Sequence, residues 1–281
     1  MQLINTITEM QALAQNTFPG KSIGFVPTMG FLHQGHLSLV ERSVSECDLT
    51  VVSIFVNPAQ FGANEDLDSY PRDMDRDLKL LEPLGVDYVF FPSNGMMYPS
   101  GYKTWVEVRE LSDVLCGASR PGHFVGVATV VLKLVNLVKP TYMYMGEKDF
   151  QQVTVLQTML RDLNLSTRIV PCPIIRDGNG LALSSRNTYL SPTDYPKALS
   201  LSRCITRAQE LASSGERLSE NILRELNILL QNSGAKPDYI SIVDSRSLSP
   251  QSVVDCNSRL ILAAFVGKTR LIDNGRVLLD N

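Results

Sequence analysis

The first half of the chain switches between short apolar runs and stretches in which apolar residues recur at helical spacing. The runs at residues 22–26 and 49–56 predict two buried strands, the first stopped by Pro27. Between them, Leu37 and Val40 share one face of a predicted helix. A strand, a helix and a strand in succession indicate parallel strands joined by a right-handed crossover.

This alternation continues to about residue 176 and predicts further elements. We expect helices at 72–85, 125–138 and 150–164, and strands at 86–92, 141–146 and 167–175. A series of this kind is typical of an α/β fold with a Rossmann-like doubly wound parallel sheet and helices on both faces.

The pattern changes after residue 176. RDGNG is a turn signal, and beyond residue 191 two long helical segments precede predicted strands at 238–244, 260–266 and 269–273. We therefore predict two domains, a Rossmann-like nucleotide-binding domain over residues 1–176 and a smaller α+β C-terminal domain over residues 177–281.

Composition and charge narrow the classes of partner. The chain has 281 residues, 44% of them hydrophobic, and a formal net charge of −3 with both signs interspersed. This balance is unlike a nucleic-acid-binding or anionic-membrane surface, and no run reaches the roughly 20 apolar residues of a spanning helix. The N-terminal stretch lacks the pattern of a secretory leader, and the five cysteines are dispersed without a CxxC pair. We expect a cytoplasmic protein without nucleic-acid or membrane partners.

Candidate chemistry begins in the turn after the first predicted strand, PTMGFLHQGHLSL, residues 27–39. Gly30 and Gly35 allow a backbone to approach a ligand closely, and the start of the following helix supplies N–H donors and a partial positive charge. His33 and His36 lie one helical turn apart, so both rings can face one anion. These residues favour a phosphate-binding turn.

Two other interpretations of the histidines remain open at this point. A zinc site would need a third ligand, either His123, the remaining histidine of the chain, or a carboxylate. The other interpretation is a pair of surface histidines without chemistry.

The stretch TMGFLHQGH resembles the HxGH signature of the nucleotidyltransferase superfamily, which includes the class I aminoacyl-tRNA synthetases. In that superfamily the motif binds the nucleotide phosphates and stabilises the transition state of adenylyl transfer.

Further stretches narrow this resemblance: SIFVNPAQF at 53–61, SRPGHFVGV at 119–127, GEKDFQQ at 146–152 and LALSSRN at 181–187. Together with VPTMGFLHQGH they resemble the pantothenate synthetase family, in the same order over nearly the whole chain. The resemblance implies an ATP-dependent ligase that condenses (R)-pantoate with β-alanine through a pantoyl adenylate and releases AMP and pyrophosphate. Ala59 departs from the family, which often has Met at that position.

The resemblance also implies which residues bind ATP. They are Met29, Gly30, Phe31, Leu32, His33, Gln34, Gly35, His36, Gly146, Glu147, Lys148, Asp149, Ile175, Leu183, Ser184, Ser185 and Arg186. Among them, the catalytic group comprises His33, His36, Lys148, Ser184, Ser185 and Arg186.

The residues themselves fit these roles. Lys148 follows a predicted strand and can direct a positive charge at phosphate oxygens, although a solvated lysine at a helix start is the plainer interpretation. Ser184, Ser185 and Arg186 resemble the mobile loop that closes over the phosphates in this superfamily. The second domain is accordingly expected to act as a lid.

Neutral amides supply the expected acid-binding side of the site. Asn57, Gln60 and Gln152 can donate and accept hydrogen bonds, which suits a ligand with hydroxyls and a carboxylate. The resemblance implies that these residues bind pantoate and that Gln60 also contacts β-alanine. Amides that cap their own turns are the alternative.

Several further assignments are less determined. Asp75 and Asp77 are candidates for holding Mg²⁺, but a solvated charge run on an exposed helix explains them as well, and the metal ligands stay unidentified. Arg120 and His123 are candidates for a phosphate or lid contact. Residues 62–73 are a candidate flap, and the family resemblance implies a homodimer.

Three rival functions share some of these features. A nucleotidyltransferase acting on a phosphorylated acceptor would share HxGH but would not need the paired amides. A regulatory protein that senses ATP would bind it without releasing pyrophosphate. A zinc hydrolase would use the three histidines as metal ligands.

Overall fold

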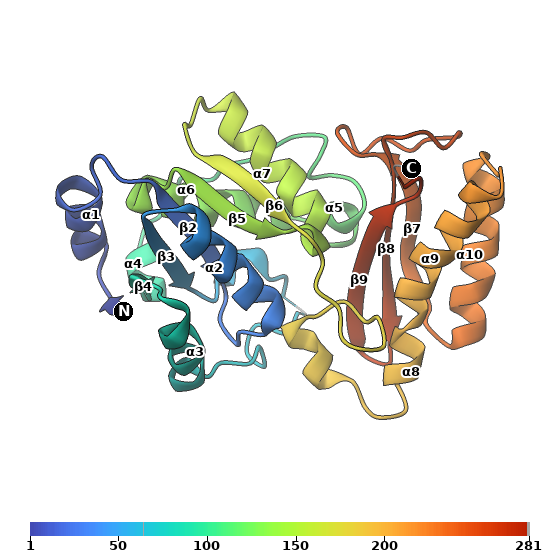
Figure 1. Cartoon of the computed structure of the whole chain (residues 1–281), viewed down its shortest axis with the longest axis horizontal. Helices are drawn as coiled ribbons and strands as arrows, with labels where there is room; N and C mark the ends of the chain where they lie inside the picture. Colours follow the sequence, from blue (N-terminus) through green and yellow to red (C-terminus); the bar gives the residue numbers. More distant parts are fainter. Residues whose placement is uncertain (64, 280–281) are drawn as a thin grey trace. The chain divides into compact units, whose positions relative to one another are not determined.

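The computed structural model of the chain describes residues 1–63 and 65–279, which form two compact units (Figure 1). The first unit comprises Met1–Asp113, Arg120–Glu147 and Gln152–Pro173, and the second comprises Val114–Ser119, Lys148–Gln151 and Ile174–Asn281. The main division, between residues 173 and 174, lies three residues before the limit predicted from the sequence. Within the described residues, no helix combines the length and apolar character needed to cross a bilayer.

The first unit is built on a six-stranded sheet in which all neighbouring strands are parallel. Its strands are β1 (Gln2–Ile4), β2 (Ile23–Thr28), β3 (Leu49–Ile54), β4 (Tyr88–Phe90), β5 (Tyr142–Gly146) and β6 (Arg168–Cys172). Their order is β1-β4-β3-β2-β5-β6, so the chain leaves β2 toward β3 on one side and later returns to β5 on the other. This arrangement confirms the predicted doubly wound fold and places its switch point between β2 and β5.

Helices lie between these strands in the chain. They are α1 (Ile7–Asn16), α2 (Gln34–Glu46), α3 (Met74–Leu81), α4 (Asn94–Met97), α6 (His123–Val138) and α7 (Phe150–Asp162), with 3₁₀ turns η1 (Pro58–Gln60), η2 (Glu82–Leu84) and η3 (Glu147–Asp149). The strongly apolar run at 125–138 is therefore a helix, as predicted, and begins two residues earlier.

Both faces of the sheet are buried. Val26 and Val52 belong to a hydrophobic cluster with Leu39 of α2. Their neighbours Phe25 and Val51 are also completely buried, and they face the other side because side chains alternate along a strand. Burial on both faces explains why these strands read as continuous apolar runs in the sequence.

Pro27 does not end the first predicted strand. β2 continues through it to Thr28, with Pro27 opposite Ser53 of β3. Within the described residues, β5 pairs only with Gly24 and Phe25 of β2. One edge of β2 therefore has no ladder at Pro27, and a residue without an N–H is tolerated there.

β1 and α1 were not predicted from the sequence pattern. β1 is too short for a periodicity signal and is recruited to the sheet edge by pairing with β4. α1 begins with a capping box, in which Thr6 Oγ1 accepts from the backbone N–H of Glu9 and a Glu9 carboxylate oxygen accepts from the N–H of Thr6. The Thr-x-x-Glu pattern was thus a readable helix start.

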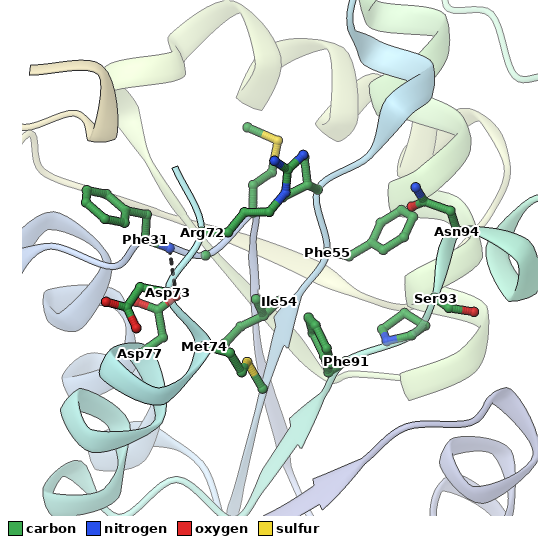
Figure 2. Close-up of a pocket in the computed structure, with 14 residues that line it drawn as sticks. Phe31, Ile54, Phe55, Arg72, Asp73, Met74, Asp77, Phe91, Ser93 and Asn94 are labelled. Atoms are coloured by element: carbon green, nitrogen blue, oxygen red, sulfur yellow. Dashed lines mark hydrogen bonds between the residues drawn. The ribbon is translucent and has the colours of Figure 1, made fainter. Parts of the chain in front are cut away.

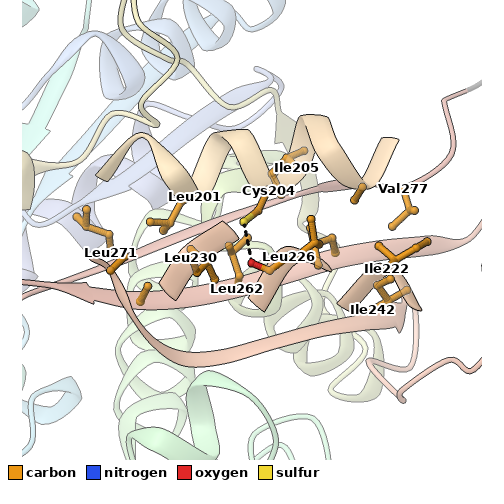
Figure 3. Packing of buried hydrophobic residues seen from close by; sticks show 14 of the residues in the cluster. Leu201, Cys204, Ile205, Ile222, Leu226, Leu230, Ile242, Leu262, Leu271 and Val277 are labelled. Atoms are coloured by element: carbon orange, nitrogen blue, oxygen red, sulfur yellow. Dashed lines mark hydrogen bonds between the residues drawn. The ribbon is translucent and has the colours of Figure 1, made fainter. Parts of the chain in front are cut away.

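The second unit is a smaller α+β assembly, as predicted. Its antiparallel strands are β7 (Lys236–Asp244), β8 (Ser258–Val266) and β9 (Thr269–Arg276), and its helices are α5 (Cys116–Ser119), α8 (Tyr195–Ala198), α9 (Ser200–Ser213) and α10 (Ser219–Ser233), with the 3₁₀ turn η4 (Ser185–Tyr189). Leu262 of β8 packs in one buried cluster with Leu201 of α9 and Leu226 of α10 (Figure 3).

Candidate active site

The two histidines of the HxGH stretch stand at the start of α2, directly after β2. His33 is the N-cap residue, and its Nδ1 accepts from the backbone N–H of Gly35 at 3.1 Å. Nδ1 of His36 accepts from the backbone N–H of His33 at 3.3 Å, and the two ring centroids are 4.0 Å apart. Because each Nδ1 is an acceptor, the hydrogen of each neutral ring is on Nε2, which is therefore a donor. Two such donors at a helix N-terminus suit an anion.

A buried carboxylate holds the loop that leads to these histidines. Oδ2 of Asp77 accepts from the backbone N–H of Phe31 at 2.7 Å (Figure 2). Oδ1 accepts from the backbone N–H of Leu32, also at 2.7 Å. The Asp77 residue is 1% exposed, and burial raises the pKa of its carboxyl above the usual value. The expectation of a solvated charge run is therefore wrong for Asp77, whereas Asp75 is exposed.

The backbone of this loop requires a glycine. Gly30 has φ of +81° and is followed by Phe31 at +50°. A Cβ at Gly30 would lie 3.0 Å from both Asp77 Oδ2 and Ile54 Cγ2. The sequence suggested that Gly30 lets the backbone approach a ligand closely. In the structure, the groups close to Gly30 are side chains of the protein itself.

The amides of the NPAQF stretch lie in the turn after β3. Asn57 is 1% exposed and caps η1, where its Oδ1 accepts from the N–H of Ala59 at 3.3 Å. Its Nδ2 donates to Gln60 Oε1 at 3.0 Å, and Gln60 Nε2 lies 3.1 Å from Met29 Sδ. The structure therefore brings Gln60 next to the loop that carries the histidines. Gln152 lies in the first turn of α7 and is partly exposed.

Arg120 and His123 contact the same turn. The Arg120 guanidinium pairs with both carboxylate oxygens of Glu65, at 2.5 and 2.6 Å. His123 Nδ1 donates to the carbonyl of Gln60 at 2.8 Å, and its Nε2 lies 3.0 Å from Arg120 Nη1. Burial alone would raise the pKa of Glu65, but the hydrogen bonds and positive charge of Arg120 hold this pKa below its usual value. This pair ties residue 65 of the candidate flap to the start of α6; Asn64 of the flap lies outside the described residues.

The ring nitrogens bear on the zinc interpretation. Nδ1 of His33 and of His36 accepts backbone N–H groups, and both nitrogens of His123 lie at hydrogen-bond distance from protein groups. In residues 1–63 and 65–279, no group of three or more His, Cys, Asp or Glu side chains is arranged to hold a metal ion. The three histidines therefore do not form a common ligand set in the described chain.

Lys148 belongs to the second unit. Its side chain is 20% exposed, and Nζ is 3.8 Å from the Asp149 carboxylate. The Lys148 carbonyl accepts from Nδ2 of Asn274, a residue that is 2% exposed in β9. Asn274 therefore holds the backbone at Lys148, a contact that the sequence pattern did not predict.

The Ser-Ser-Arg stretch opens η4 in the same unit. Ser184 is the N-cap, and its Oγ accepts from the backbone N–H of Arg186 at 3.2 Å. The turn before it is held by Arg176, which donates to both carboxylate oxygens of the buried Asp273 at 2.7 and 2.9 Å. The backbone N–H of Leu183 donates to the carbonyl of Ile175 at 2.9 Å, so a hydrogen bond joins these two expected ATP contacts.

A cavity of about 260 Å³ opens beyond the carboxyl ends of β2, β3 and β4 (Figure 2). It is lined by Met29, Gly30, Phe31, Ile54, Phe55, Val56, Arg72, Asp73, Met74, Asp77, Phe91, Pro92, Ser93 and Asn94. Open parallel sheets bind ligands at this edge. Only Met29, Gly30 and Phe31 among these lining residues were expected to bind ATP. The others come from the end of β3, the flap, α3 and the segment after β4.

The site residues expected from the sequence are divided between the two units. His33, His36, Asn57, Gln60 and Gln152 belong to the first unit. Lys148, Ser184, Ser185 and Arg186 belong to the second. Within the first unit, the hydrogen bonds described above join the histidine loop and the amide turn into one site.

Comparison with known proteins identifies the family. The model of the family described as Pantoate-beta-alanine ligase matches residues 2–276. The pantothenate synthetases of Fervidobacterium nodosum and Thermosipho africanus are 51% and 52% identical, with 98% of this chain and 98% and 99% of theirs covered. A crystal structure of the Thermus thermophilus enzyme superimposes with a TM-score of 0.95 at 45% identity, covering 99% of this chain and all of that one.

A second solved structure of the family is a complex with ligands. The Pantoate-beta-alanine ligase of Francisella tularensis, complexed with beta-gamma ATP and beta-alanine, matches with a TM-score of 0.84 at 38% identity, covering 99% of this chain and 98% of that one. Both the sequence and the fold are thus shared over the full length of these relatives. The chain therefore belongs to the pantoate-beta-alanine ligase family.

Proposed function

We propose that His33 and His36 bind the phosphates of ATP in the reaction of this family, the ATP-dependent joining of pantoate to β-alanine. The observation that carries the proposal is the orientation of the rings. Each Nδ1 accepts a backbone N–H, so each ring offers Nε2–H as a donor at the N-terminus of α2. Donors fixed before the ligand arrives stabilise developing phosphoryl charge without reorganisation.

The other ATP contacts are assigned to both units. We place Met29, Gly30, Phe31, Leu32, Gln34 and Gly35 around the phosphates on the first unit, with Gly146 and Glu147 after β5. On the second unit we place Lys148, Asp149, Ile175, Leu183, Ser184, Ser185 and Arg186. The Francisella relative is complexed with beta-gamma ATP and beta-alanine, and this chain would likewise bind ATP and β-alanine.

The proposed first step is attack of a pantoate carboxylate oxygen on the α-phosphorus of ATP. An O–P bond forms to give pantoyl adenylate, and the bond to the β-phosphate oxygen breaks to release pyrophosphate. A carboxylic acid with a pKa of about 4 is ionised at neutral pH, so this step needs no general base. Gln60 and Gln152 would hold the pantoate in line for attack, which is the main requirement of phosphoryl transfer. Asn57 belongs to this pantoate side of the site through its hydrogen bond to Gln60.

The proposed second step is attack of the β-alanine amine on the acyl carbon of the adenylate. A C–N bond forms, AMP leaves, and the amine loses a proton. Gln60 is the proposed β-alanine contact. The mixed anhydride is prone to hydrolysis, so water must be excluded between the steps. We propose residues 62–73 as the flap, because Glu65 within it pairs with Arg120 beside Gln60.

We propose that Mg²⁺ enters with the nucleotide as MgATP. The two Asp77 oxygens accept backbone N–H groups at 2.7 Å, and the residue is 1% exposed, so we assign this carboxylate to holding the loop and not to the metal. Phosphate oxygens commonly supply most of the Mg²⁺ ligands in nucleotide sites.

The homodimer and the cytoplasmic location stay proposals. The apolar runs at 49–56 and 125–138 do not argue for an interface, because Val51, Val52 and Leu134 are buried within the chain. The homodimer therefore rests on the resemblance, and light scattering during gel filtration tests it. All five cysteines are free thiols, which fits a reducing compartment.

Exchange of labelled pyrophosphate into ATP tests the proposed mechanism, with Mg²⁺ present and β-alanine omitted. Exchange that requires pantoate is expected, because adenylate formation is reversible before the amine arrives. ATP binding without pantoate-dependent exchange would overturn the adenylate step.

A further inference from the structure

Asn57 is 1% exposed, and its side-chain hydrogen bonds are made to other groups of the protein. Its Oδ1 accepts from the Tyr98 hydroxyl at 2.8 Å and from the N–H of Ala59 at 3.3 Å. Its Nδ2 donates to the carbonyl of Gly126 at 3.1 Å and to Gln60 Oε1 at 3.0 Å. A side-chain amide has two donor hydrogens and two acceptor positions, so the capacity of Asn57 is fully used within the protein.

Backbone groups fix the polarity of this amide. The N–H of Ala59 can only donate, and the carbonyl of Gly126 can only accept. Oδ1 of Asn57 must therefore face Ala59, and Nδ2 must face Gly126. It follows that the Tyr98 hydroxyl donates its hydrogen, and that Gln60 meets Asn57 with Oε1.

The same logic orients Gln60. With Oε1 bound to Asn57, the NH₂ group is turned toward the loop after β2, where Nε2 lies 3.1 Å from Met29 Sδ. A thioether is a weak acceptor, and Nε2 carries a second hydrogen. Gln60 is thereby presented as a donor on the side of the loop after β2.

Tyr98 is held in place for this role by its own neighbours. Its ring stacks on Trp105 at 6.0 Å between centroids and meets Tyr102 edge-on at 5.2 Å, while Lys133 Nζ lies 5.7 Å from its centroid. Burial raises the pKa of Tyr98 well above its usual range, so the hydroxyl keeps its hydrogen at neutral pH. Both observations suit a permanent donor.

We propose that Tyr98 is a positioning residue for pantoate binding, because its hydroxyl fixes Asn57 and thereby holds the Gln60 amide with its NH₂ group toward an acceptor oxygen of the substrate. This inference rests on the proposed contact between Gln60 and pantoate. It assigns Asn57 an indirect role, and it specifies that Gln60 recognises a carboxylate or hydroxyl oxygen by donation.

The test compares Tyr98→Phe with Gln60→Ala and with the double variant, measuring KM for pantoate and for ATP. Loss of one buried hydrogen bond is expected to raise the pantoate KM of Tyr98→Phe by about 5- to 20-fold, with the KM for ATP unchanged. In the Gln60→Ala background, Tyr98→Phe is expected to have no further effect on pantoate, because the donor that it positions is gone. Tyr102→Phe is the matched control, since it removes a neighbouring hydroxyl and leaves the Tyr98–Asn57 bond in place.

A second variant tests the direction of the hydrogen bond. Gln60→Glu keeps an oxygen for Asn57 Nδ2 but replaces the donor with a second acceptor. It is expected to raise the pantoate KM by at least about 10-fold, because a carboxylate repels an acceptor oxygen. A pantoate KM close to that of the wild type would overturn the donor assignment.

The outcomes separate the inference from the function on which it rests. If Gln60→Ala leaves the pantoate KM unchanged, the proposed Gln60 contact is wrong. If Gln60→Ala raises it and Tyr98→Phe does not, the positioning role of Tyr98 is wrong. An effect of Tyr98→Phe that persists in the Gln60→Ala background, or that is matched by Tyr102→Phe, would reveal a general structural role and would also overturn the inference.

Discussion

Two neighbouring segments of the first unit are held in different ways. The loop after β2 is held by the carboxylate of Asp77, through two bonds of 2.7 Å to backbone N–H groups. The turn after β3 is held by neutral groups, through bonds of 2.8 to 3.3 Å around Asn57. Charge-assisted hydrogen bonds are shorter and roughly twice as strong as neutral ones. The loop is therefore held more firmly, but by a group that titrates.

The difference matches what each segment presents. The loop carries two imidazole donors toward a proposed phosphate, and a firm backbone keeps both rings in place. The turn presents one amide, for which the direction of the hydrogen bond matters more than its strength. A network of neutral groups fixes that direction at any working pH.

The largest expected effect is the loss of a phosphate donor itself. His36→Ala is expected to lower the rate of pantoate-dependent pyrophosphate exchange by about 10²- to 10³-fold, as removal of one preorganised donor does elsewhere. Glu41→Ala, at an exposed position of the same helix, is the control. A near-normal exchange rate in His36→Ala would contradict the phosphate role.

A comparable loss of activity is expected when an added side chain displaces the turn after β3. A Cβ at Gly126 of α6 would meet the Ala59 carbonyl oxygen at 2.2 Å and the Gln60 nitrogen at 2.7 Å. Gly126→Ala is therefore expected to displace η1 and to lower kcat/KM for pantoate by about 10²-fold, since a shift of about 1 Å is that costly. Gly95→Ala in α4 is the matched control, because a Cβ there meets nothing within 4 Å. Equal kcat/KM values for the two variants would rule out the steric account.

Removing the charge under the loop is expected to have a smaller effect. Asp77→Asn keeps one acceptor for Phe31 or Leu32 and replaces the other with a donor. We expect the KM for ATP to rise by about 10-fold, and additional Mg²⁺ should not restore it. Asp75→Asn, at an exposed position on the same helix, should leave the KM for ATP unchanged. Recovery with Mg²⁺ would instead identify Asp77 as a metal ligand.

The smallest expected effect is a pH dependence of stability. Burial raises the folded-state pKa of Asp77 above the ordinary value of 3.8, so the folded chain holds this proton more tightly than the unfolded chain. The contribution of Asp77 to the free energy of unfolding therefore falls as the pH rises from about 3.8 through the raised pKa. The urea midpoint of the wild type minus that of Asp77→Asn should decrease over this interval. An increase would show that the hydrogen bonds outweigh burial.

Much of the fold could be predicted from the sequence. The alternation of apolar runs and helical periods identified β2, α2, β3 and α6, because burial on two faces or on one stripe leaves a local periodicity. It did not identify β1, whose three residues are too few to show a period, nor the continuation of β2 through Pro27. Both depend on which neighbouring strand is present to pair with them.

The candidate site was only partly predictable for a related reason. The HxGH stretch lies within a few residues of the chain, and its local hydrogen bonds agree with the expectation of paired donors. Asp77, by contrast, looked like one member of an exposed charge run. The helical spacing of α3 does place position 77 on the same face as Met74 and Leu81, which pack in a buried cluster. A charged residue at that position nevertheless gave no reason to expect that its carboxylate is buried.

By itself, the sequence determined the order of those strands and helices that show a clear periodicity, the two-part organisation and the chemistry offered by each motif, because these depend on residues close together in the chain. Only the tertiary structure decided which side chains hold those motifs in position. Asp77 lies 46 residues from Phe31, Tyr98 lies 41 from Asn57, and Asn274 lies 126 from Lys148. Such partners are selected when packed elements meet, and the need to satisfy every buried polar group then sets their orientation.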